Sequence, residues 1–319
     1  MKNLKSISTM LISLFLMIFL LIGCNQENSI VQPNTPTNDK EALQKVVDSD
    51  EVIQSFEPNY NEDQAMQFIF GKVSAEIFPV KVGQRMRRIN REFNATVEGD
   101  SAFGTLKTTF EGMLYIIAAY DSASANPFDT SLTLIQKPFT TTVTRNIIFK
   151  KRDSLNSLMN GWKIVAVSLP EGGTLTDNIS IKSMTVFLPN GDTLNVTSPN
   201  DYYLSRGEKL RHLIPIFDRF EPVKVQVEVS SVYQDPDFVT LTYGGVFKTH
   251  GLHRAKRKFE MVSEEFDGTF YNRVYEGTWR VNQFPGIKHA IVNAFPRLVI
   301  FDDQAPVESN SWGMPYIVK

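Results

Sequence analysis

The amino-acid sequence predicts an α+β protein, in which a small domain of helices and antiparallel strands precedes an all-β sandwich. Apolar residues recur at intervals of three and four positions through Glu41–Phe56, as on one face of an amphipathic helix. Beyond Met86, short segments rich in β-branched and aromatic residues alternate with Gly, Pro, Asn and Asp, which is typical of strands and turns. Helices followed by a run of strands favour an α+β arrangement.

The first 23 residues have the organisation of a secretory signal peptide. Lys2 and Lys5 precede a stretch without charge that runs to Gly23, and Cys24 is the only cysteine of the chain. The segment Leu21-Ile22-Gly23-Cys24 resembles the lipobox of bacterial lipoproteins, and this resemblance implies cleavage after Gly23 and a lipid on Cys24. The alternative is an uncleaved membrane anchor. About 20 apolar residues span a bilayer, and the uncharged run Ser6–Gly23 is close to that length.

Residues 24–39 predict a flexible tether between the lipid and the folded body. Asn, Gln, Pro, Thr and Ser dominate the segment, and such a composition buries too little apolar surface to fold. Asn25 differs from the aspartate that retains some lipoproteins at the inner membrane. The resemblance therefore favours the outer membrane of the bacterial cell envelope, with the membrane itself as a partner through the lipid anchor.

The composition excludes some classes of protein and some sources of stability. A chain with one cysteine forms no internal disulfide, so its stability has to come from apolar burial. The supply is sufficient, because 42% of the residues are hydrophobic and 23 are Phe. Lys and Arg number 33 against 35 Asp and Glu, whereas a nucleic-acid partner calls for a basic face, so none is predicted.

The predicted α+β domain covers residues 40–169. Asn38 or Asp39 is expected to cap the first helix and Pro58 to end it, and a second helix is expected at residues 61–70. The strands that follow are predicted from their β-branched and aromatic content: residues 86–97, 101–110, 113–120, 140–150 and 161–168.

Three segments of this domain carry a resemblance to a known family. Val97–Ala102, Arg145–Lys150 and Trp162–Ser168 stand where the cone-shaped nuclear-transport-factor-2-like superfamily has successive strands of its sheet. The resemblance implies a cone-like, curved sheet packed on helices, with a concave face that can hold a site. Catalytic members of the superfamily tend to place an Asp–His pair inside the cone, whereas residues 40–169 contain no histidine.

Residues 170–178, which begin with Pro-Glu-Gly-Gly, predict a linker to an all-β domain at residues 179–319. Valine alternates with polar residues through Val223–Val229, so that strand is expected to have one buried and one exposed face. The spacing of the short strands resembles immunoglobulin- and fibronectin-type sandwiches, although the Cys–Trp–Cys signature of true immunoglobulin domains is absent. The expected strands are 180–188, 193–197, 223–233, 238–243, 256–263, 269–281, 288–294 and 298–301.

Four ionisable residues of the first domain are candidates for a polar cavity: Asp121, Asp129, Arg145 and Arg152. In such a cavity Arg145 would lie opposite a carboxylate. The sequence contains no pattern that identifies a Ser–His–Asp catalytic triad, a Cys–His pair or a phosphate-binding glycine loop. No catalytic residue and no cofactor is therefore predicted.

The second domain contains a run of cations that predicts a patch for an anion or a lipid headgroup: Lys248, Arg254, Lys256, Arg257 and Lys258. The alternative is that these cations protect a strand edge from aggregation. His250 and His253 lie in the same run and could share a metal ion with His212 or His289. The surrounding cations oppose a divalent ion, so no metal is predicted.

Two further features of the second domain are expected to be structural. The acidic groups Asp235/Asp237, Glu264/Glu265 with Asp267, and Asp302/Asp303 lack the spacing of a calcium loop and are interpreted as turn residues, with acid–base hydrolysis of a sugar as the alternative. The apolar segment Trp312–Val318 predicts a closing edge strand, with an exposed docking strip as the alternative.

These observations predict a lipid-anchored protein of the cell envelope that binds or assembles without catalysis. Its partner would be a protein, a glycan or a small ligand, recognised by the concave face of the first domain or by the sandwich. The alternative is an envelope hydrolase whose site lies in the cone of the first domain or between the domains. A purely structural spacer is the third hypothesis.

Overall fold

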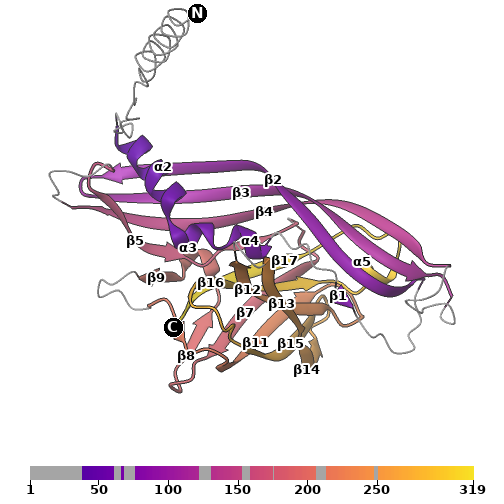
Figure 1. Ribbon diagram of the computed structural model, residues 1–319. Helices are drawn as coiled ribbons and strands as arrows, with labels where there is room; N and C mark the ends of the chain where they lie inside the picture. The colour runs from indigo at the N-terminus through magenta and orange to yellow at the C-terminus, as the bar shows by residue number, and fades with distance from the viewer. Residues whose placement is uncertain are drawn as a thin grey trace, which may run out of the picture.

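The computed structural model describes residues 38–60, 66–67, 76–121, 131–152, 159–174, 176–205, 213–247 and 251–319. Within these ranges the protein is mostly β, and its antiparallel strands form two sheets (Figure 1). The predicted signal peptide, the tether up to residue 37, Gly23, Cys24, Asp129 and Lys248 lie outside the described residues. No helix in the described part of the chain is long and apolar enough to cross a membrane.

The chain enters the described body through three short helices: α2 (Asp39–Ser49), α3 (Glu51–Gln54) and α4 (Glu57–Tyr60). The side chain of Asn38 caps α2 by accepting a hydrogen bond from the backbone N–H of Glu41, as predicted. The single helix expected through Glu41–Phe56 is wrong, because Asp50 adopts an extended backbone and caps α3 by accepting from the N–H of Ile53. Pro58 lies inside α4 instead of ending the pattern.

Three long antiparallel strands curve across one side of the molecule: β2 (Phe78–Glu98), β3 (Ser101–Ala119) and β4 (Thr133–Lys151) (Figure 1). The strands expected at 101–110 and 113–120 are one continuous strand, because Gly112 keeps its ladder and makes room for the ring of Phe139. Strand β5 (Trp162–Ser168) follows β4, and β1 (Met66–Gln67) pairs with β2, where part of a second helix was expected.

The expected linker, residues 170–178, contains a strand that joins the two halves of the chain. Strand β6 (Glu171–Gly173) pairs with β4 on one side and with β17 (Asn310–Val318) on the other. Added Cβ atoms at Gly172 and Gly173 would lie 2.5 Å from the carbonyl oxygen of Thr142 and 2.2 Å from that of Ser309. The glycines of this segment therefore allow backbones to approach closely, which is a different use from flexibility.

The C-terminal segment lies in the middle of a sheet, so the prediction of an edge strand is wrong. Strand β17 pairs with β6 and with β16 (Gly286–Phe295), which continues to β12 (Phe238–Phe247) and β13 (Gly251–Lys258). Both edges of β17 are paired. One partner, β16, precedes β17 in the chain, and the other, β6, comes from a segment far away in the sequence. Two short strands complete this sheet: β9 (Tyr203–Ser205) beside β5, and β10 (Ile216–Phe217) beside β17.

The second sheet has the order β14-β15-β11-β7-β8. Its strands are β7 (Ile179–Phe187), β8 (Thr193–Val196), β11 (Pro222–Ser231), β14 (Glu260–Phe266) and β15 (Tyr271–Arg280). The valines at 223, 225, 227 and 229 are all buried, which confirms the alternation predicted for this strand. The strand predicted at residues 298–301 is wrong, because Leu298–Phe301 form the short helix α5.

The hydrophobic core is continuous across the predicted boundary between the domains. One cluster of buried side chains includes Leu43 of α2, Phe149 of β4, Val227 of β11 and Trp279 of β15. Trp162 and Trp279 are both buried, as predicted. The domain limits at 40–169 and 179–319 stay predictions, and the described residues pack on one another through both the sheet and this core.

Candidate functional site

A cavity of about 250 Å³ opens between the N-terminal helices and the inner face of β2, β3 and β4. We call it the arginine cavity, because Arg88, Arg91 and Arg145 line it. The other lining residues are Asp48, Ile53, Gln54, Phe56, Glu57, Leu106, Thr108, Phe110, Val143 and Pro170. Of the proposed ionisable residues that the structure describes, Arg145 lines this cavity and Asp121 and Arg152 do not.

The register of the strands brings these side chains to one face. Leu106 lies opposite Arg145, Arg88 opposite Phe110, and Arg91 opposite Thr108. In a regular strand Arg88 and Arg91, three residues apart, would face opposite sides. A β-bulge between Arg88 and Asn90 inserts one extra residue, so both arginines lie on the side of the cavity.

Arg145 is buried, and its contacts include His289, the carbonyl of Val52 and the ring of Phe56. Its guanidinium donates a hydrogen bond to Nε2 of His289 on β16 at 2.8 Å and a longer one to the carbonyl of Val52 at 3.5 Å. The guanidinium carbon also lies 5.7 Å from the centre of the Phe56 ring, within range of a cation–π contact. Arg145 is 3% exposed, so its charge is almost fully withdrawn from water.

These contacts fix the protonation state of His289. A guanidinium only donates, so Nε2 of His289 accepts and the ring proton lies on Nδ1. Nδ1 then donates to Oγ of Ser55 at 2.9 Å, and Ser55 in turn donates to the carbonyl of Val52 at 3.0 Å. Burial, together with the charge of Arg145, lowers the pKa of His289 well below its usual value.

Two ion pairs lie at the rim of the cavity and join the helices to β2. Arg88 pairs with Glu57 of α4 at 2.7 Å, and Arg91 pairs with Asp48 of α2. The side chains of the Arg88–Glu57 pair are 44% and 39% exposed, so water screens them. The lining thus includes three arginines and two carboxylates.

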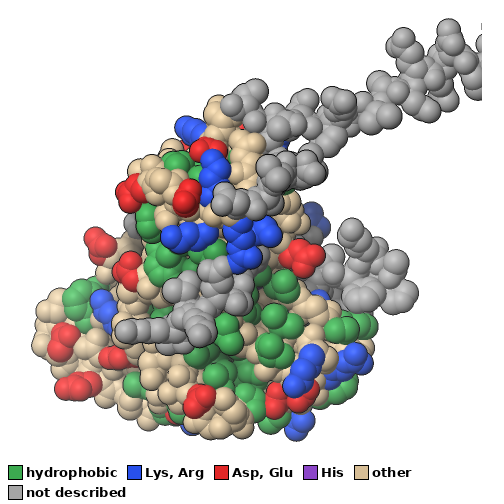
Figure 2. Space-filling model, turned by 90° about the vertical axis from the view of Figure 1, so that its left-hand side faces the viewer, with side chains coloured by type: hydrophobic (Ala, Val, Ile, Leu, Met, Phe, Trp, Pro, Cys, Tyr) green, Lys and Arg blue, Asp and Glu red, His purple; other side chains and the backbone are tan. Residues whose placement is uncertain are grey.

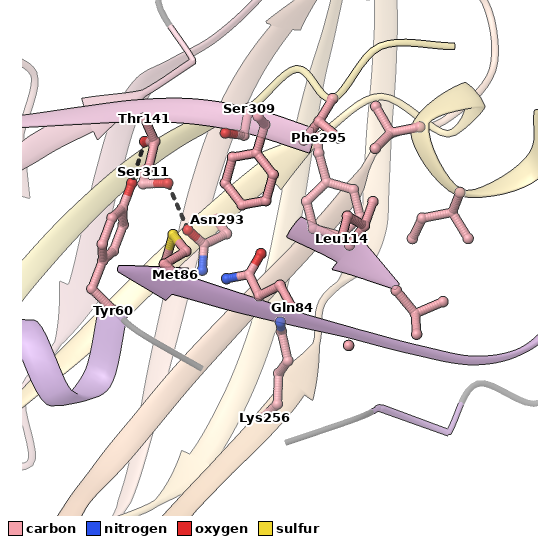
Figure 3. A pocket seen from close by; sticks show the side chains of 16 residues that line it. Tyr60, Gln84, Met86, Leu114, Thr141, Lys256, Asn293, Phe295, Ser309 and Ser311 are labelled. Carbon is pink, nitrogen blue, oxygen red and sulfur yellow. Dashed lines mark hydrogen bonds between the residues drawn. The ribbon is translucent and has the colours of Figure 1, made fainter. Parts of the chain in front are cut away.

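A second pocket lies where residues of both predicted domains meet (Figure 3). The side chains of Gln84, Lys256 and Asn293 point toward one another in it, and apolar residues such as Leu114 and Phe295 form its other wall. Tyr60 and Thr141 close one end through a hydrogen bond of 2.6 Å between their hydroxyl oxygens. Its volume of about 50 Å³ has room for a few water molecules, so the larger arginine cavity is the better candidate for a ligand site.

The structure does not bring Asp121 or Arg152 to Arg145, and Asp129 lies outside the described residues. Asp121 is exposed just after β3 ends, 15 residues beyond Leu106, the partner of Arg145, which corresponds to about 50 Å of extended strand. Arg152 is exposed beyond the opposite end of β4. Asp121 and Arg152 therefore lie near opposite ends of the long strands, away from Arg145.

The described residues of the predicted basic patch belong to the edge strand β13, and they do not form one exposed surface. Lys256 is half-buried and lines the second pocket, whereas Arg257 and Lys258 are exposed. The ammonium group of Lys258 lies 5.0 Å from the centre of the Phe238 ring. Arg254 belongs to β13, but its side chain is outside the described part of the structure. The cations thus follow the outer edge of a sheet, where lysines oppose edge-to-edge pairing.

The face of the molecule at the left end of Figure 1 carries charges of both signs. Figure 2 shows Lys and Arg side chains gathered over its upper part, with carboxylates among them and hydrophobic side chains spread below. Lys150 and Lys163, both exposed, lie opposite each other on β4 and β5 near this end. The mixture of charges agrees with the balanced composition of the chain.

Two of the acidic pairs predicted as turn residues contribute to a buried ion network instead. Arg273 of β15 is fully buried and donates to Asp237 at 2.8 Å and to Glu264 at 2.5 Å. It also donates to the carbonyls of Tyr233 and Gln234. Burial raises the pKa of Asp237, and the guanidinium opposes that shift. The network fixes the segment before β12 to the second sheet.

The third acidic pair lies in a cluster of three carboxylates, Glu76, Asp302 and Asp303, at the surface beside α5. Tyr120 donates a hydrogen bond to Asp303 at 2.8 Å, and the buried ammonium of Lys137 donates to the carbonyl of Val299 at 2.8 Å. Lys137 also donates to the carbonyl of Asp302. These contacts hold the end of α5 against β4.

No known protein family, curated protein or solved structure matches this chain. The candidate site therefore stands on its own geometry. Sequence reasoning pointed to Arg145 and considered His289 only as a metal ligand, and it missed Ser55, Arg88 and Arg91. His289 carried a signal that could have been used, because it is a single histidine within the apolar strand 288–294 and a buried histidine needs hydrogen-bond partners.

Proposed function

We propose that this protein is a lipid-anchored protein of the bacterial cell envelope whose body binds a small ligand in the arginine cavity without catalysis. The lipobox-like segment that ends in Cys24 supports the anchor, and the cavity supports the binding role. The packing of α2 against β2 and β5 is compatible with a first unit like the nuclear-transport-factor-2 superfamily, whereas α3 also contacts β16 and α4 contacts β12 and β16. Residues 179–319 would then form an immunoglobulin-like sandwich.

The observation that carries the proposal is the hydrogen-bond chain from Arg145 through His289 and Ser55 to the carbonyl of Val52. This chain holds a buried guanidinium in one orientation at the wall of a cavity. Binding sites commonly combine a largely apolar lining with a few polar groups fixed in this way. An envelope protein, tethered by its lipid, would present such a cavity to small molecules outside the cell membrane.

The same chain gives the hydrolase alternative less support. Ser55 and His289 are 2.9 Å apart, the distance of a nucleophile and its base. A base has to accept the serine proton, but Nδ1 of His289 already carries a proton and Ser55 donates to Val52. The carboxylates at the rim, Asp48 and Glu57, are each paired with an arginine. The hypothesis of a structural spacer has even less support. A spacer would be expected to have a packed interior without a cavity, whereas this protein contains the arginine cavity.

Equilibrium dialysis against an envelope extract, followed by mass spectrometry of the retained small molecules, tests the proposal. Thr108→Phe places a ring in the cavity, and Lys107→Phe places the same ring on the opposite, exposed face of β3 as the control. We expect the wild type and Lys107→Phe to retain the same compound and Thr108→Phe to lose it. Equal retention by all three folded proteins, or none by the wild type, would contradict the proposal.

A further inference from the structure

The second pocket has polar side chains on one side and a buried apolar wall on the other. Gln84 of β2 and Asn293 of β16 point toward each other in it, with Lys256 of β13 beside them (Figure 3). All three residues are half-buried, so the pocket is open to solvent on their side. Leu114, on the other wall, is 7% exposed. A chemical group that enters the pocket therefore meets hydrogen-bonding side chains near the mouth and hydrocarbon at the inner wall.

The two amide side chains have hydrogen-bonding capacity that the described part of the protein does not use. Oδ1 of Asn293 accepts from Oγ of Ser311 at 2.6 Å, but its Nδ2 donates to no group among the described residues, and Gln84 makes no side-chain hydrogen bond to them. Thr240 lies directly opposite Asn293 in the ladder and is fully buried, and its hydroxyl also has no partner among the residues described. Lys256 has an interaction of its own, so the two amides carry the recognition.

The size of the pocket limits the group that can enter it. A buried water molecule needs about 10–15 Å³ of such space, so the volume of about 50 Å³ takes a group of roughly four non-hydrogen atoms. A whole ring does not fit, but one end group of a ligand that continues into solvent does. This end group has to offer an apolar tip to the inner wall, and a donor and an acceptor to the amides at the mouth.

We propose that the second pocket binds the acetamido group of an N-acetylated ligand. The methyl of the group would contact Leu114 and Phe295, its carbonyl oxygen would accept from Nδ2 of Asn293, and its N–H would donate to Oε1 of Gln84. The remainder of the ligand would continue past Lys256 into solvent. The second pocket and the arginine cavity share no lining residue, so this site does not depend on the function proposed for that cavity.

Other end groups of the same size satisfy the pocket less well. A carboxylate has no donor for Oε1 of Gln84, and it would lose hydration beside a wall of hydrocarbon. An alkyl group would contact that wall, but it would cover the amides of Gln84 and Asn293 without bonding to them, and polar groups that lose water without a new partner oppose binding. The acetamido group meets both requirements at once.

Saturation-transfer NMR on the full-length protein in detergent tests the inference, because it detects weak binding and identifies the ligand protons that contact the protein. N-acetylglucosamine carries the acetamido group, and glucose has a hydroxyl in its place. We expect N-acetylglucosamine to bind, with the strongest saturation on its acetyl methyl, and glucose to bind at least about tenfold more weakly.

A third probe, N-acetylglycinamide, carries the same group without the sugar ring and distinguishes two sources of this chemistry. If it binds more tightly than N-acetylglucosamine, the acetamido group belongs to an acylated peptide end. If it binds more weakly, the group belongs to a sugar.

Three variants locate the binding. Gln84→Leu removes the amide at nearly constant size and should weaken the binding of the acetylated probes by at least about threefold. Gln136→Leu makes the same exchange at an exposed position of β4 and should bind like the wild type. Thr108→Phe obstructs the arginine cavity and should also bind like the wild type. Thermal unfolding of each variant establishes that it is folded.

Equal binding of N-acetylglucosamine and glucose, or no binding of any of the three probes, would overturn the inference. Stronger saturation of the ring protons than of the acetyl methyl would overturn it too, as would a loss of binding in Thr108→Phe that Gln84→Leu does not show. The comparison of the probes uses only the wild type, so it holds even where Gln84→Leu does not fold. The dialysis experiment decides separately on the arginine cavity.

Discussion

Arg145 of β4 and His289 of β16 meet in the core, with a guanidinium nitrogen 2.8 Å from Nε2 of the imidazole. The two residues are 144 positions apart and belong to the two different domains predicted from the sequence. Their contact places a side chain of the C-terminal half directly behind the wall of a cavity that the N-terminal half forms. The candidate site therefore depends on the packing of both halves.

The buried pair predicts that acid destabilises the protein through His289. Burial and Arg145 hold the pKa of His289 well below 6.5 in the folded state, whereas the unfolded chain titrates near that value. Between the two pKa values the unfolded state binds more protons, so the free energy of unfolding falls as the pH decreases below about 6.5. The contribution of one histidine reaches about 1.4 kcal/mol for each pH unit.

Urea denaturation of the wild type and His289→Gln between pH 8 and pH 5 measures this effect. We expect the variant to be less stable at pH 8, because the Gln amide can accept from Arg145 but places no donor where Nδ1 meets Ser55, and to depend less on pH below about 6.5. The difference between the two curves removes the contribution of the carboxylates, which both proteins share. If the free energies of unfolding of the two proteins changed with pH in parallel, protonation of His289 would not destabilise the folded state, and the prediction would be wrong.

The ion network around Arg273 predicts a large loss of stability in Arg273→Met. The substitution keeps the apolar stem but leaves the carboxylate of Asp237 buried without its cation, and two backbone carbonyls lose their donors. Breaking a buried ion pair from one side costs about 3–5 kcal/mol. Lys224→Met, which breaks the exposed pair with Glu276, should cost less than about 1 kcal/mol. Urea denaturation of both variants checks the contrast, and similar losses would contradict it.

The sequence was sufficient for features that depend on local pattern. Alternating valines predicted the buried face of β11, and Asn38, one of the two residues expected to cap α2, is its cap. Arg145 was one of four ionisable residues proposed for the first domain, and the structure places it at the cavity. The prediction failed where one residue alters periodicity or where distant segments pair. The bulge that turns Arg88 and Arg91 to the same side leaves no pattern in the sequence.

Long-range pairing accounts for the other errors. Residues 170–178 read as a linker because Gly and Pro are typical of loops, whereas Gly172 and Gly173 provide close approach of β4 and β17. The C-terminal strand was predicted to be an edge strand. One of its two neighbouring strands, Glu171–Gly173, is more than 100 residues away in the sequence and could not be foreseen. Side-chain patterns describe which face is buried, but they do not identify the strand that lies alongside.

The lipobox-like segment predicts that Cys24→Ser releases the protein from the membrane. The substitution removes the thiol that the lipid would occupy, and each buried methylene of such a lipid contributes about 0.8 kcal/mol to membrane binding. We expect the wild type to incorporate a labelled fatty acid and to sediment with membranes, and the variant to do neither. Ser29→Ala, which changes a hydroxyl five residues later, is the control and should behave like the wild type. Sedimentation of Cys24→Ser with the membranes would instead favour an uncleaved anchor.

The close packing around β6 predicts that Gly173→Ala lowers the free energy of unfolding more than Gly191→Ala does. At Gly173 an added Cβ would lie 2.2 Å from the carbonyl oxygen of Ser309, in a backbone with φ of +148° that favours glycine. At Gly191 the backbone also favours glycine, with φ of +90°, but no atom lies within 4 Å of the added Cβ. Gly191→Ala should therefore cost about 1 kcal/mol for the backbone alone. Gly173→Ala should cost about 3 kcal/mol or more, because β17 has to move away from β6. Thermal and urea unfolding of the two variants measure the difference, and equal costs would mean that β6 does not hold the halves of the chain together.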